Sequence, residues 1–369
     1  MARLRRLALC DVIEDLPNPV SLGDRQFLQK DALFVCALGF EERCLTVPRT
    51  LARRGYRTQR AIYLRYATNQ ADNDANRPEL LSRLQEVADE VDSLEVDSDE
   101  YTQQMRSVIE SLDGGDGEAP CVTFDISVAA NRVILRVLRI LLDSNVYLRF
   151  IYTEAAIYRP TKEEYEAEPQ KWIDNLDGLE RGVEVVGVSS DHVGQHLDSL
   201  PDCVMLFPSF NVDRSEAVLS FVDPALIISP GERVVWLLGI PHLTENLWRL
   251  EAMRDINKLR GESVPQYEIS TFKYKETLER LHAICEERWR SHRFSLSPLG
   301  SKMQAVGAAL ASFMHPEIRV ILAVPREYNA SRYSHGAKEI WELEFGDMAK
   351  VCRTLGSVGT LMIDEDGRR

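Results

Sequence analysis

Short apolar segments alternate with longer amphipathic stretches along most of the chain. The short segments predict β-strands, because they are bounded by polar or glycine-containing turns. They fall near residues 33–38, 61–66, 93–97, 121–126 and 146–153, and again near 203–207, 233–239, 266–271, 293–297 and 318–324. Several intervening stretches have helical spacing, as in 131–143 and 302–314. Strands that alternate with helices predict an α/β fold with mostly parallel sheets covered on both faces.

An internal duplication organises this pattern. A shift of 170 residues superimposes similar segments, and the matched pairs are Phe40 and Phe210, Ser127 and Ser297, Arg132 and Lys302, Arg149 and Arg319, and Tyr158 and Tyr328. Repeated segments of this kind indicate repeated structural units. We therefore expect two duplicated Rossmann-like halves.

The repeat and the chain length of 369 residues suggest the division of the chain, since one domain usually holds roughly 100–200 residues. We expect an N-terminal extension (1–30), a first half (31–160), a connector (161–200), a second half (201–330) and a C-terminal extension (331–369). The connector contains one helix-like run and a short strand at 183–188. The C-terminal extension is expected to add a helix and a terminal hairpin or edge strand.

Charge and cysteine usage narrow the functional classes. The net charge is −14, and between Glu86 and Glu118 Arg106 is the only basic residue. Bulk binding of duplex nucleic acid through phosphates is therefore not expected; this acidic stretch is typical of a solvated helix face and a loop. The seven scattered cysteines indicate reduced thiols. Because no uncharged apolar run approaches about 20 residues, we expect a cytoplasmic protein without membrane contact.

The sharpest local feature is the turn from Pro298 to Lys302, which follows Ser297 at the end of a predicted strand. In doubly wound sheets, ligands bind beyond the carboxyl ends of the strands, where helix N-termini converge. Gly300 permits close backbone approach, Ser301 offers a hydroxyl, and Lys302 adds a charge for phosphate. The alternative is an ordinary tight turn in which Ser301 caps the helix.

The equivalent position in the first half holds Asp125, Ser127, Asn131 and Arg132. Asp125 ends an otherwise apolar strand at the carboxyl edge, which favours a place in a site. Ser127 or Asn131 could instead cap the following helix. Arg132 could belong to a solvated stripe on that helix.

Residues after the first strand of each half form a second set of candidates. Phe40 and Arg43 in the first half correspond to Phe210 and Arg214 in the second. If the halves share one cleft, the two arginines would make a symmetric pair of anion contacts. The glutamates at positions 41 and 42 have a simpler interpretation, since acids at a helix N-terminus are favoured by the helix dipole.

Aromatic residues follow the last strand of the second half. Tyr328 and the loop from Tyr333 to Gly336 lie at a predicted carboxyl end. Their rings could stack on a base. They could equally pack the C-terminal extension.

Common catalytic and cofactor motifs are absent from the sequence. It contains no GxGxxG fingerprint, no GxSxG elbow, no HExxH pair and no Walker A loop, so the hydrolase, dinucleotide and zincin classes lose their main support. His192 and His196 are four residues apart, but Gly194 and the missing third ligand argue against a metal site. We expect no cofactor and no metal.

The strand–turn–helix pattern of residues 30–330 resembles the CARF family, the CRISPR-associated Rossmann fold sensors of cyclic oligonucleotides in prokaryotic defence. In that family, a loop after the first strand and a turn after the fourth strand line a twofold ligand pocket. The segments Ser127 to Arg132 and Ser297 to Lys302 are similar to that turn. The second half has a single glycine in the turn and the first half has none. The resemblance implies two halves that act as a fused dimer.

Three functions follow as hypotheses. The first is a sensor in antiviral defence or regulation that holds a phosphate-bearing, nucleotide-like ligand between the halves through Lys302, Arg132 and the hydroxyls of Ser127 and Ser297. The second is an enzyme that cleaves a nucleotide or phosphodiester, with Asp125 and Lys302 as candidate catalytic residues. The third is an interaction subunit that meets a protein partner of a larger defence complex.

Overall fold

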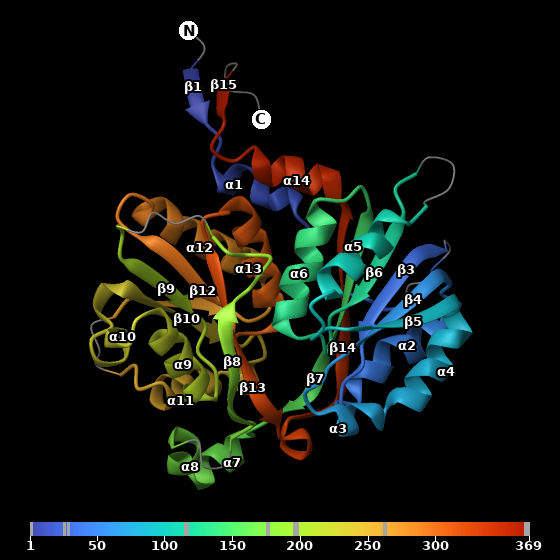
Figure 1. Ribbon diagram of the computed structural model, residues 1–369, viewed down its shortest axis with the longest axis horizontal. Coiled ribbons are helices and arrows are strands. Elements are labelled where there is room, and N and C mark those ends of the chain that lie inside the picture. Colours follow the sequence, from blue (N-terminus) through green and yellow to red (C-terminus); the bar gives the residue numbers. More distant parts are fainter. Residues whose placement is uncertain are drawn as a thin grey trace.

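The computed structural model describes residues 3–24, 27, 30–113, 118–174, 178–194, 199–260 and 264–364. Two α/β halves lie side by side, each with a central sheet between layers of helices (Figure 1). The fold class predicted from the sequence, two Rossmann-like halves with mostly parallel sheets, is confirmed.

The first sheet has seven strands in the order β2-β14-β7-β6-β3-β4-β5. Five of them are parallel and match the five strands predicted for the first half: β3 (Asp31–Ala37), β4 (Thr58–Arg65), β5 (Ala88–Glu95), β6 (Cys121–Asp125) and β7 (Tyr147–Tyr158). β5 begins earlier than predicted, directly after helix α4 (Arg77–Val87). Its acids lie on the sheet edge and pair with bases: Asp89 with Lys30, Asp92 with Arg60, and Glu95 with Arg65.

The second sheet has six strands in the order β11-β10-β9-β12-β13-β8. Its five parallel strands are β9 (Asp202–Leu206), β10 (Val234–Ile240), β11 (Gln266–Ser270), β12 (Arg293–Ser297) and β13 (Arg319–Tyr328). They follow one another across the sheet in the same order as their counterparts in the first half. The internal duplication read from the sequence is therefore present in the topology.

Helices cover both sheets. The first half carries α2 (Arg43–Arg53), α3 (Gln70–Asp74), α4, α5 (Tyr101–Glu110) and α6 (Asn131–Leu142). The second half carries α9 (Val212–Val222), α10 (Ala225–Ile228), α11 (Trp248–Ile256), α12 (Tyr274–Arg288) and α13 (Lys302–Met314). The short helices α7 (Lys162–Ala167) and α8 (Pro169–Ile173) follow β7.

The strand that follows the last parallel strand of each half crosses to the other half. β8 (Glu180–Val188) follows β7 in the chain, but it pairs antiparallel with β13. β14 (Ser334–Asp347) follows β13, but it pairs antiparallel with β7. The segments predicted as connector and C-terminal extension thus each complete the sheet of the half on the far side (Figure 1). The two halves are joined by a reciprocal strand exchange.

The chain termini meet beyond this exchange. The first sheet ends in β2 (Val20–Ser21), which pairs with β14. Helices α1 (Leu9–Val12) and α14 (Met348–Gly356) pack together, and β1 (Arg3–Arg6) pairs with β15 (Leu361–Asp364) in a small ribbon that projects from the top of the molecule in Figure 1. The expected helix and terminal strand of the C-terminal extension are both present.

Equivalent helices form the interface between the halves. α6 packs on α13, and one hydrophobic cluster contains buried residues of both halves, such as Leu138 and Leu310. α13 also packs tightly on α12, because a Cβ on Gly307 would come within 2.7 Å of Thr277 Cβ. Among the described residues, the helices are all too short or too polar to span a bilayer.

Candidate functional site

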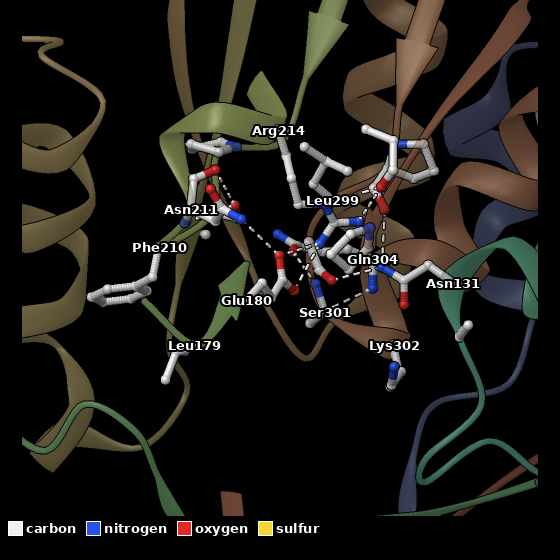
Figure 2. Close-up of a pocket in the computed structure, with 18 of the residues that line it drawn as sticks. Asn131, Leu179, Glu180, Phe210, Asn211, Arg214, Leu299, Ser301, Lys302 and Gln304 are labelled. Carbon is white, nitrogen blue, oxygen red and sulfur yellow. Dashed lines mark hydrogen bonds and ion pairs between the residues drawn. The ribbon is translucent and has the colours of Figure 1, made fainter. Parts of the chain in front are cut away.

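Two adjoining cavities lie where the carboxyl ends of the two sheets face each other. The first, about 270 Å³, is lined mainly by the second half but also by Asn131 and Arg132 of the first (Figure 2). The second, about 280 Å³, has walls from both halves. A smaller cavity of about 90 Å³ lies on the first-half side. Lys302 and Tyr333 line all three, so they stand at the junction.

The turn before α13 has the geometry of a helix cap. The Ser301 hydroxyl accepts a hydrogen bond from Gln304 N–H, and Gln304 Oε1 accepts one from Ser301 N–H at 2.9 Å. Gly300 is required here, because a Cβ at this position would meet the Gln304 side chain and lie 3.1 Å from Phe207. The serine cap that the sequence offered as the alternative is present, and the capped turn also forms part of the cavity wall.

Lys302 is the first residue of this helix and has no hydrogen-bond or ion-pair partner within the described part of the chain. Burial lowers the pKa of its amine to about 8. The surrounding charges oppose one another, since Glu41 and Glu180 raise this pKa whereas Arg43 and Arg214 lower it. A partly buried amine without a counter-ion is a ready contact for an anion.

Arg132, the counterpart of Lys302, has a different environment. Its Nη1 lies 2.5 Å from Asp97 Oδ1, and its guanidinium lies over the Tyr66 ring. Arg132 lines the first and the smallest cavity, but its charge is already balanced.

Arg43 and Arg214 occupy equivalent positions and are held in similar ways. Arg43 Nη1 donates to the carbonyl of Thr153 at 2.9 Å, and Nη2 donates to Glu41 at 2.7 Å. Arg214 Nη2 donates to the carbonyl of Ala323 at 2.7 Å, and Nη1 donates to Glu180 at 2.9 Å. Each arginine therefore joins a helix start to the last parallel strand of its half.

The carboxylates of these two networks come from different places. Glu41 lies just before α2 in the first half and accepts the Ser334 hydroxyl from the exchanged strand β14. In the second half, Glu180 is itself on the exchanged strand β8 and accepts from the Asn211 amide at 3.3 Å. Glu41 is thus an ion-pair partner of Arg43, a contact that the helix-dipole interpretation did not include.

Asp125 and Ser297, at the ends of their strands, and Ser127, just after β6, are buried and are absent from the walls of the three cavities. Asp125 accepts hydrogen bonds from the Ser127 amide and hydroxyl, and the Ser127 hydroxyl accepts from Thr153 N–H at 2.8 Å. Burial raises the pKa of Asp125 to about 7. Ser297 donates to the carbonyl of Ile321 at 2.9 Å. Their polar groups are already used within the fold.

Asn131 links the halves instead of capping α6, whose N-cap is Ala130. Its amide nitrogen donates to the carbonyls of Pro298 and Gly300 at 2.9 and 2.7 Å. These bonds hold the turn that presents Lys302. The Asn131 oxygen and the Gln304 amide nitrogen are buried without a hydrogen-bond partner among the described residues, and both side chains line the first cavity.

The aromatic candidates fall into two groups. Phe40, Tyr328 and Tyr333 pack against one another, with ring centroids 5.6 to 6.1 Å apart, and fill the first-half side of the site. Phe210 lies in the first cavity beside Trp248, on the side opposite Lys302 in Figure 2. The aromatic residues therefore leave the site more open on the side of the second half.

Arg249, which no sequence motif singled out, lines the first and second cavities. Its guanidinium donates to the carbonyls of Arg159 and Pro160 and lies 4.4 Å from the Phe210 ring centroid. Burial lowers its pKa to about 10. Arg249 has no carboxylate partner in the described part of the chain. The internal repeat could have drawn attention to Arg249, because the sequence around Arg249 is similar to the sequence around Arg83.

A histidine–glutamate pair in the second cavity was also missed. His242 Nε2 lies 3.2 Å from Glu154 Oε1, and the His242 ring stacks on Phe272. Glu154 is buried, and burial raises its pKa above the usual range. The two residues come from different halves, which explains why no sequence motif contains them.

His192 is buried, and burial lowers its pKa to about 4. Among the described residues it belongs to no group of three metal-ligating side chains. His196 lies outside the described residues.

Comparison with known proteins supports the fold. No protein-family model matches the sequence, and no curated protein matches it. Among solved structures, the chain is similar to a type III CRISPR defence DNA nuclease activated by cyclic oligoadenylate, with a TM-score of 0.50 and 11% identity over 83% of this chain and 68% of that one.

Two further structures align poorly. The cytoplasmic domain of a prokaryotic cation chloride cotransporter gives a TM-score of 0.24 at 10% identity, over 82% of this chain and 99% of that one. A protein of unknown function from Pseudomonas aeruginosa gives 0.22 at 10% identity, over 80% and 93%. Such low scores do not indicate a shared fold. The nuclease is thus a loose structural neighbour that shares the Rossmann-like arrangement.

Proposed function

We propose that the chain senses a phosphate-bearing nucleotide ligand, bound in the cavities between its two halves, in antiviral defence or its regulation. The observation that carries this proposal is Lys302, a partly buried amine without a partner at the junction of three cavities. Burying a charge without a counter-ion costs free energy unless a ligand supplies the opposite charge. The similarity to a nuclease that cyclic oligoadenylate activates is consistent with such a ligand.

Arg249 provides the second contact for the anion. Lys302 and Arg249 both line the first and second cavities, and neither has a carboxylate partner among the described residues. Arg43, Arg132 and Arg214, in contrast, are each paired with an acid. We therefore place the phosphate between Lys302 and Arg249, toward the second half.

Base recognition would use the first cavity. Phe210 offers a ring face, while the Asn131 oxygen and the Gln304 amide nitrogen offer one acceptor and one donor without partners. Their orientations are fixed, because Asn131 nitrogen already donates to two carbonyls and Gln304 oxygen accepts from Ser301 N–H. An acceptor and a donor in the wall of one cavity suit the hydrogen-bonding edge of a nucleobase.

The test is a thermal-shift and calorimetric screen of mono-, di- and cyclic oligonucleotides against the wild-type chain and Lys302→Ala. A charge-assisted contact is worth about 1.5–3 kcal/mol, so we expect K302A to weaken binding at least tenfold. Lys171→Ala is the matched control, because Lys171 is an exposed lysine on α8 that pairs with Glu168. If no nucleotide binds the wild type, the sensing function is wrong and the interaction-subunit hypothesis takes its place.

A second candidate function, cleavage of the bound phosphodiester, is favoured by the His242–Glu154 pair. A buried carboxylate that orients a histidine is an arrangement used for general base catalysis. His242 lines the same cavity as Lys302 and Arg249, the two cations that would stabilise charge on the phosphate. Mass spectrometry of the binding reactions separates the two functions: an enzyme gives products that disappear in His242→Ala while binding persists, whereas a sensor returns the ligand intact.

A further inference from the structure

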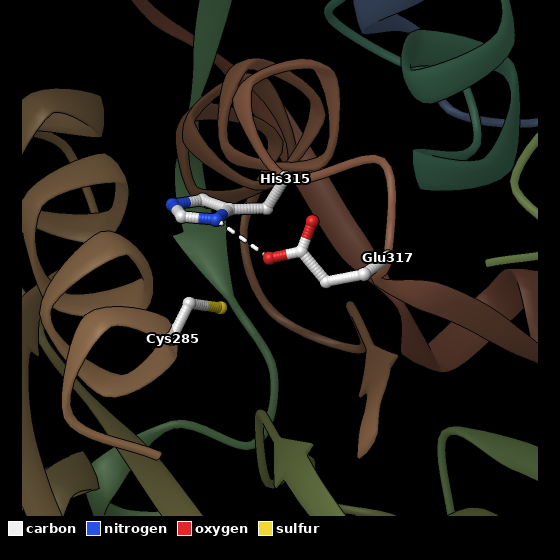
Figure 3. Close-up of side chains that lie close together, drawn as sticks. All are labelled: Cys285, His315 and Glu317. Atoms are coloured by element: carbon white, nitrogen blue, oxygen red, sulfur yellow. Dashed lines mark hydrogen bonds and ion pairs between the residues drawn. The ribbon is translucent and has the colours of Figure 1, made fainter. Parts of the chain in front are cut away.

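Three potential metal ligands come together at the end of α13 remote from Lys302. Cys285 lies on α12, His315 follows the last turn of α13, and Glu317 precedes β13 (Figure 3). Their ligand atoms all lie within 4.8 Å of one another. The sulfur and the imidazole are buried, and the carboxylate is partly exposed. No sequence motif contains this group, because Cys285 lies far from His315 and Glu317 in the chain.

A fourth residue, His282, is hydrogen-bonded to His315. His315 Nδ1 lies 2.9 Å from Glu317 Oε1, and its Nε2 lies 2.8 Å from His282 Nδ1. An ionised carboxylate only accepts hydrogen bonds. A proton or a metal ion must therefore lie between His315 Nδ1 and Glu317. With a metal ion there, His315 carries its proton on Nε2 and donates it to His282. Metal-binding histidines commonly donate their second N–H to such an outer partner.

We propose that Cys285 Sγ, His315 Nδ1 and a Glu317 carboxylate oxygen bind one divalent transition-metal ion of the zinc class, with His282 as the outer partner of His315. A thiolate, an imidazole and a carboxylate together suit zinc, whereas magnesium and calcium prefer oxygen ligands alone. The ion displaces the proton of the Cys285 sulfur when it binds. Water takes the fourth position.

The position of this site indicates a structural role. α13 runs from Lys302 to Met314, and its 13 residues span about 20 Å at roughly 1.5 Å per residue. The metal is therefore well separated from the cavities between the halves. It would tie α12 to the turn between α13 and β13, and so fix the far end of the helix that presents Lys302.

The test measures metal content directly. The wild-type chain, Cys285→Ser and Glu317→Gln are each equilibrated with zinc, dialysed and assayed by mass spectrometry of the metal. Cobalt is then titrated into each. We expect one ion per wild-type chain, a thiolate-to-cobalt absorption band, loss of the band in C285S and weaker binding in E317Q. Cys36→Ser is the matched control, since Cys36 is a buried free cysteine of the first half.

Two results would overturn the proposal. One is a wild-type chain that retains much less than one zinc ion after dialysis. The other is a cobalt band that C285S keeps or that C36S removes. Because C285S alters a buried residue and could unfold, circular dichroism of each variant accompanies the titration. The partly exposed Glu317 supplies a variant that leaves the core intact.

Discussion

Arg132 and Lys302 stand at equivalent positions of the two halves, yet only Arg132 has a carboxylate partner among the described residues. Asp97 balances the charge of Arg132 within the first half. Lys302 projects from the second half into the junction of the cavities without such a partner. Of this equivalent pair, only Lys302 is left open to an anion within the described part of the chain.

This difference predicts unequal effects of two substitutions on ligand binding. We expect Lys302→Ala to weaken nucleotide binding at least tenfold, and Arg132→Ala to weaken it less than threefold, because a paired arginine has little charge to offer. Isothermal titration calorimetry with the best ligand from the nucleotide screen measures both. Equal losses in the two variants would show that the ligand contacts the halves symmetrically.

The pH dependence of binding follows from the lowered pKa of Lys302. The amine has a pKa of about 8 in the folded, ligand-free chain, and only its protonated form attracts phosphate strongly. Affinity should therefore be highest below pH 8 and fall as the pH rises through that value. In Lys302→Arg, whose side chain stays protonated, the fall between pH 7 and pH 9 should disappear; a fall of the same size in K302R would assign the titration to another group.

Lys302→Met should stabilise the ligand-free chain near neutral pH. The pKa of Lys302 is about 8 in the folded chain against a usual 10.5, so the unfolded chain binds more protons between these values. Wild-type stability accordingly rises with pH in that window, and the cost of the buried charge is greatest below pH 8. We expect K302M to gain on the order of 1–2 kcal/mol at pH 7 and to lose the advantage above pH 10.5. Denaturant unfolding at several pH values measures it.

Asp125→Asn should stabilise the chain at high pH, whereas Lys302→Met stabilises it at neutral and lower pH. Burial raises the pKa of Asp125 to about 7, so the folded chain binds the proton more tightly than the unfolded chain and wild-type stability falls as the pH rises from about 4 to 7. An asparagine oxygen still accepts from Ser127 and carries no charge. We expect D125N to match the wild type at pH 5 and to unfold at a higher temperature at pH 8. A D125N chain that is less stable at pH 8 would show that the ionised carboxylate is needed.

Gly307→Ala tests the packing of α13. A Cβ at Gly307 would come within 2.7 Å of Thr277 on α12, which forces the two helices apart. Overpacking of this kind costs about 1–3 kcal/mol, and chemical denaturation should show the loss. Gly356→Ala is the control, because nothing lies within 4 Å of a Cβ at this residue near the end of α14, so it should be neutral or slightly stabilising.

Local patterns predicted the elements well. The helix predicted at 302–314 is α13, from Lys302 to Met314, because a capping serine begins it and apolar residues continue through it. The strands of both halves were found for a similar reason: parallel strands buried on both faces have long apolar runs. The exception, β5, is an edge strand with exposed acids, so its first residues did not differ from a polar loop.

Contacts between distant residues were not predictable in the same way. The sequence suggested Arg43 and Arg214 as a symmetric pair of anion contacts if the halves share a cleft, but it did not show that each is paired with a carboxylate. The partner of Arg214 is Glu180, on a strand whose pattern does not say which sheet it joins. Arg249 likewise reaches the walls of the first and second cavities only through tertiary packing. Residue type and spacing locate the ends of strands. Which charged side chains at those ends lack an ion-pair partner depends on how the sheets are assembled.

The strand exchange has a consequence for how the chain is made. β7 is complete at Tyr158, but its partner β14 ends only at Asp347. Ribosomes add roughly 5–20 residues per second, so the edge of β7 waits on the order of 10 s or more for its partner. β8 ends at Val188 and likewise waits for β13, which ends at Tyr328. Neither sheet can therefore be completed until strands of both halves have been made.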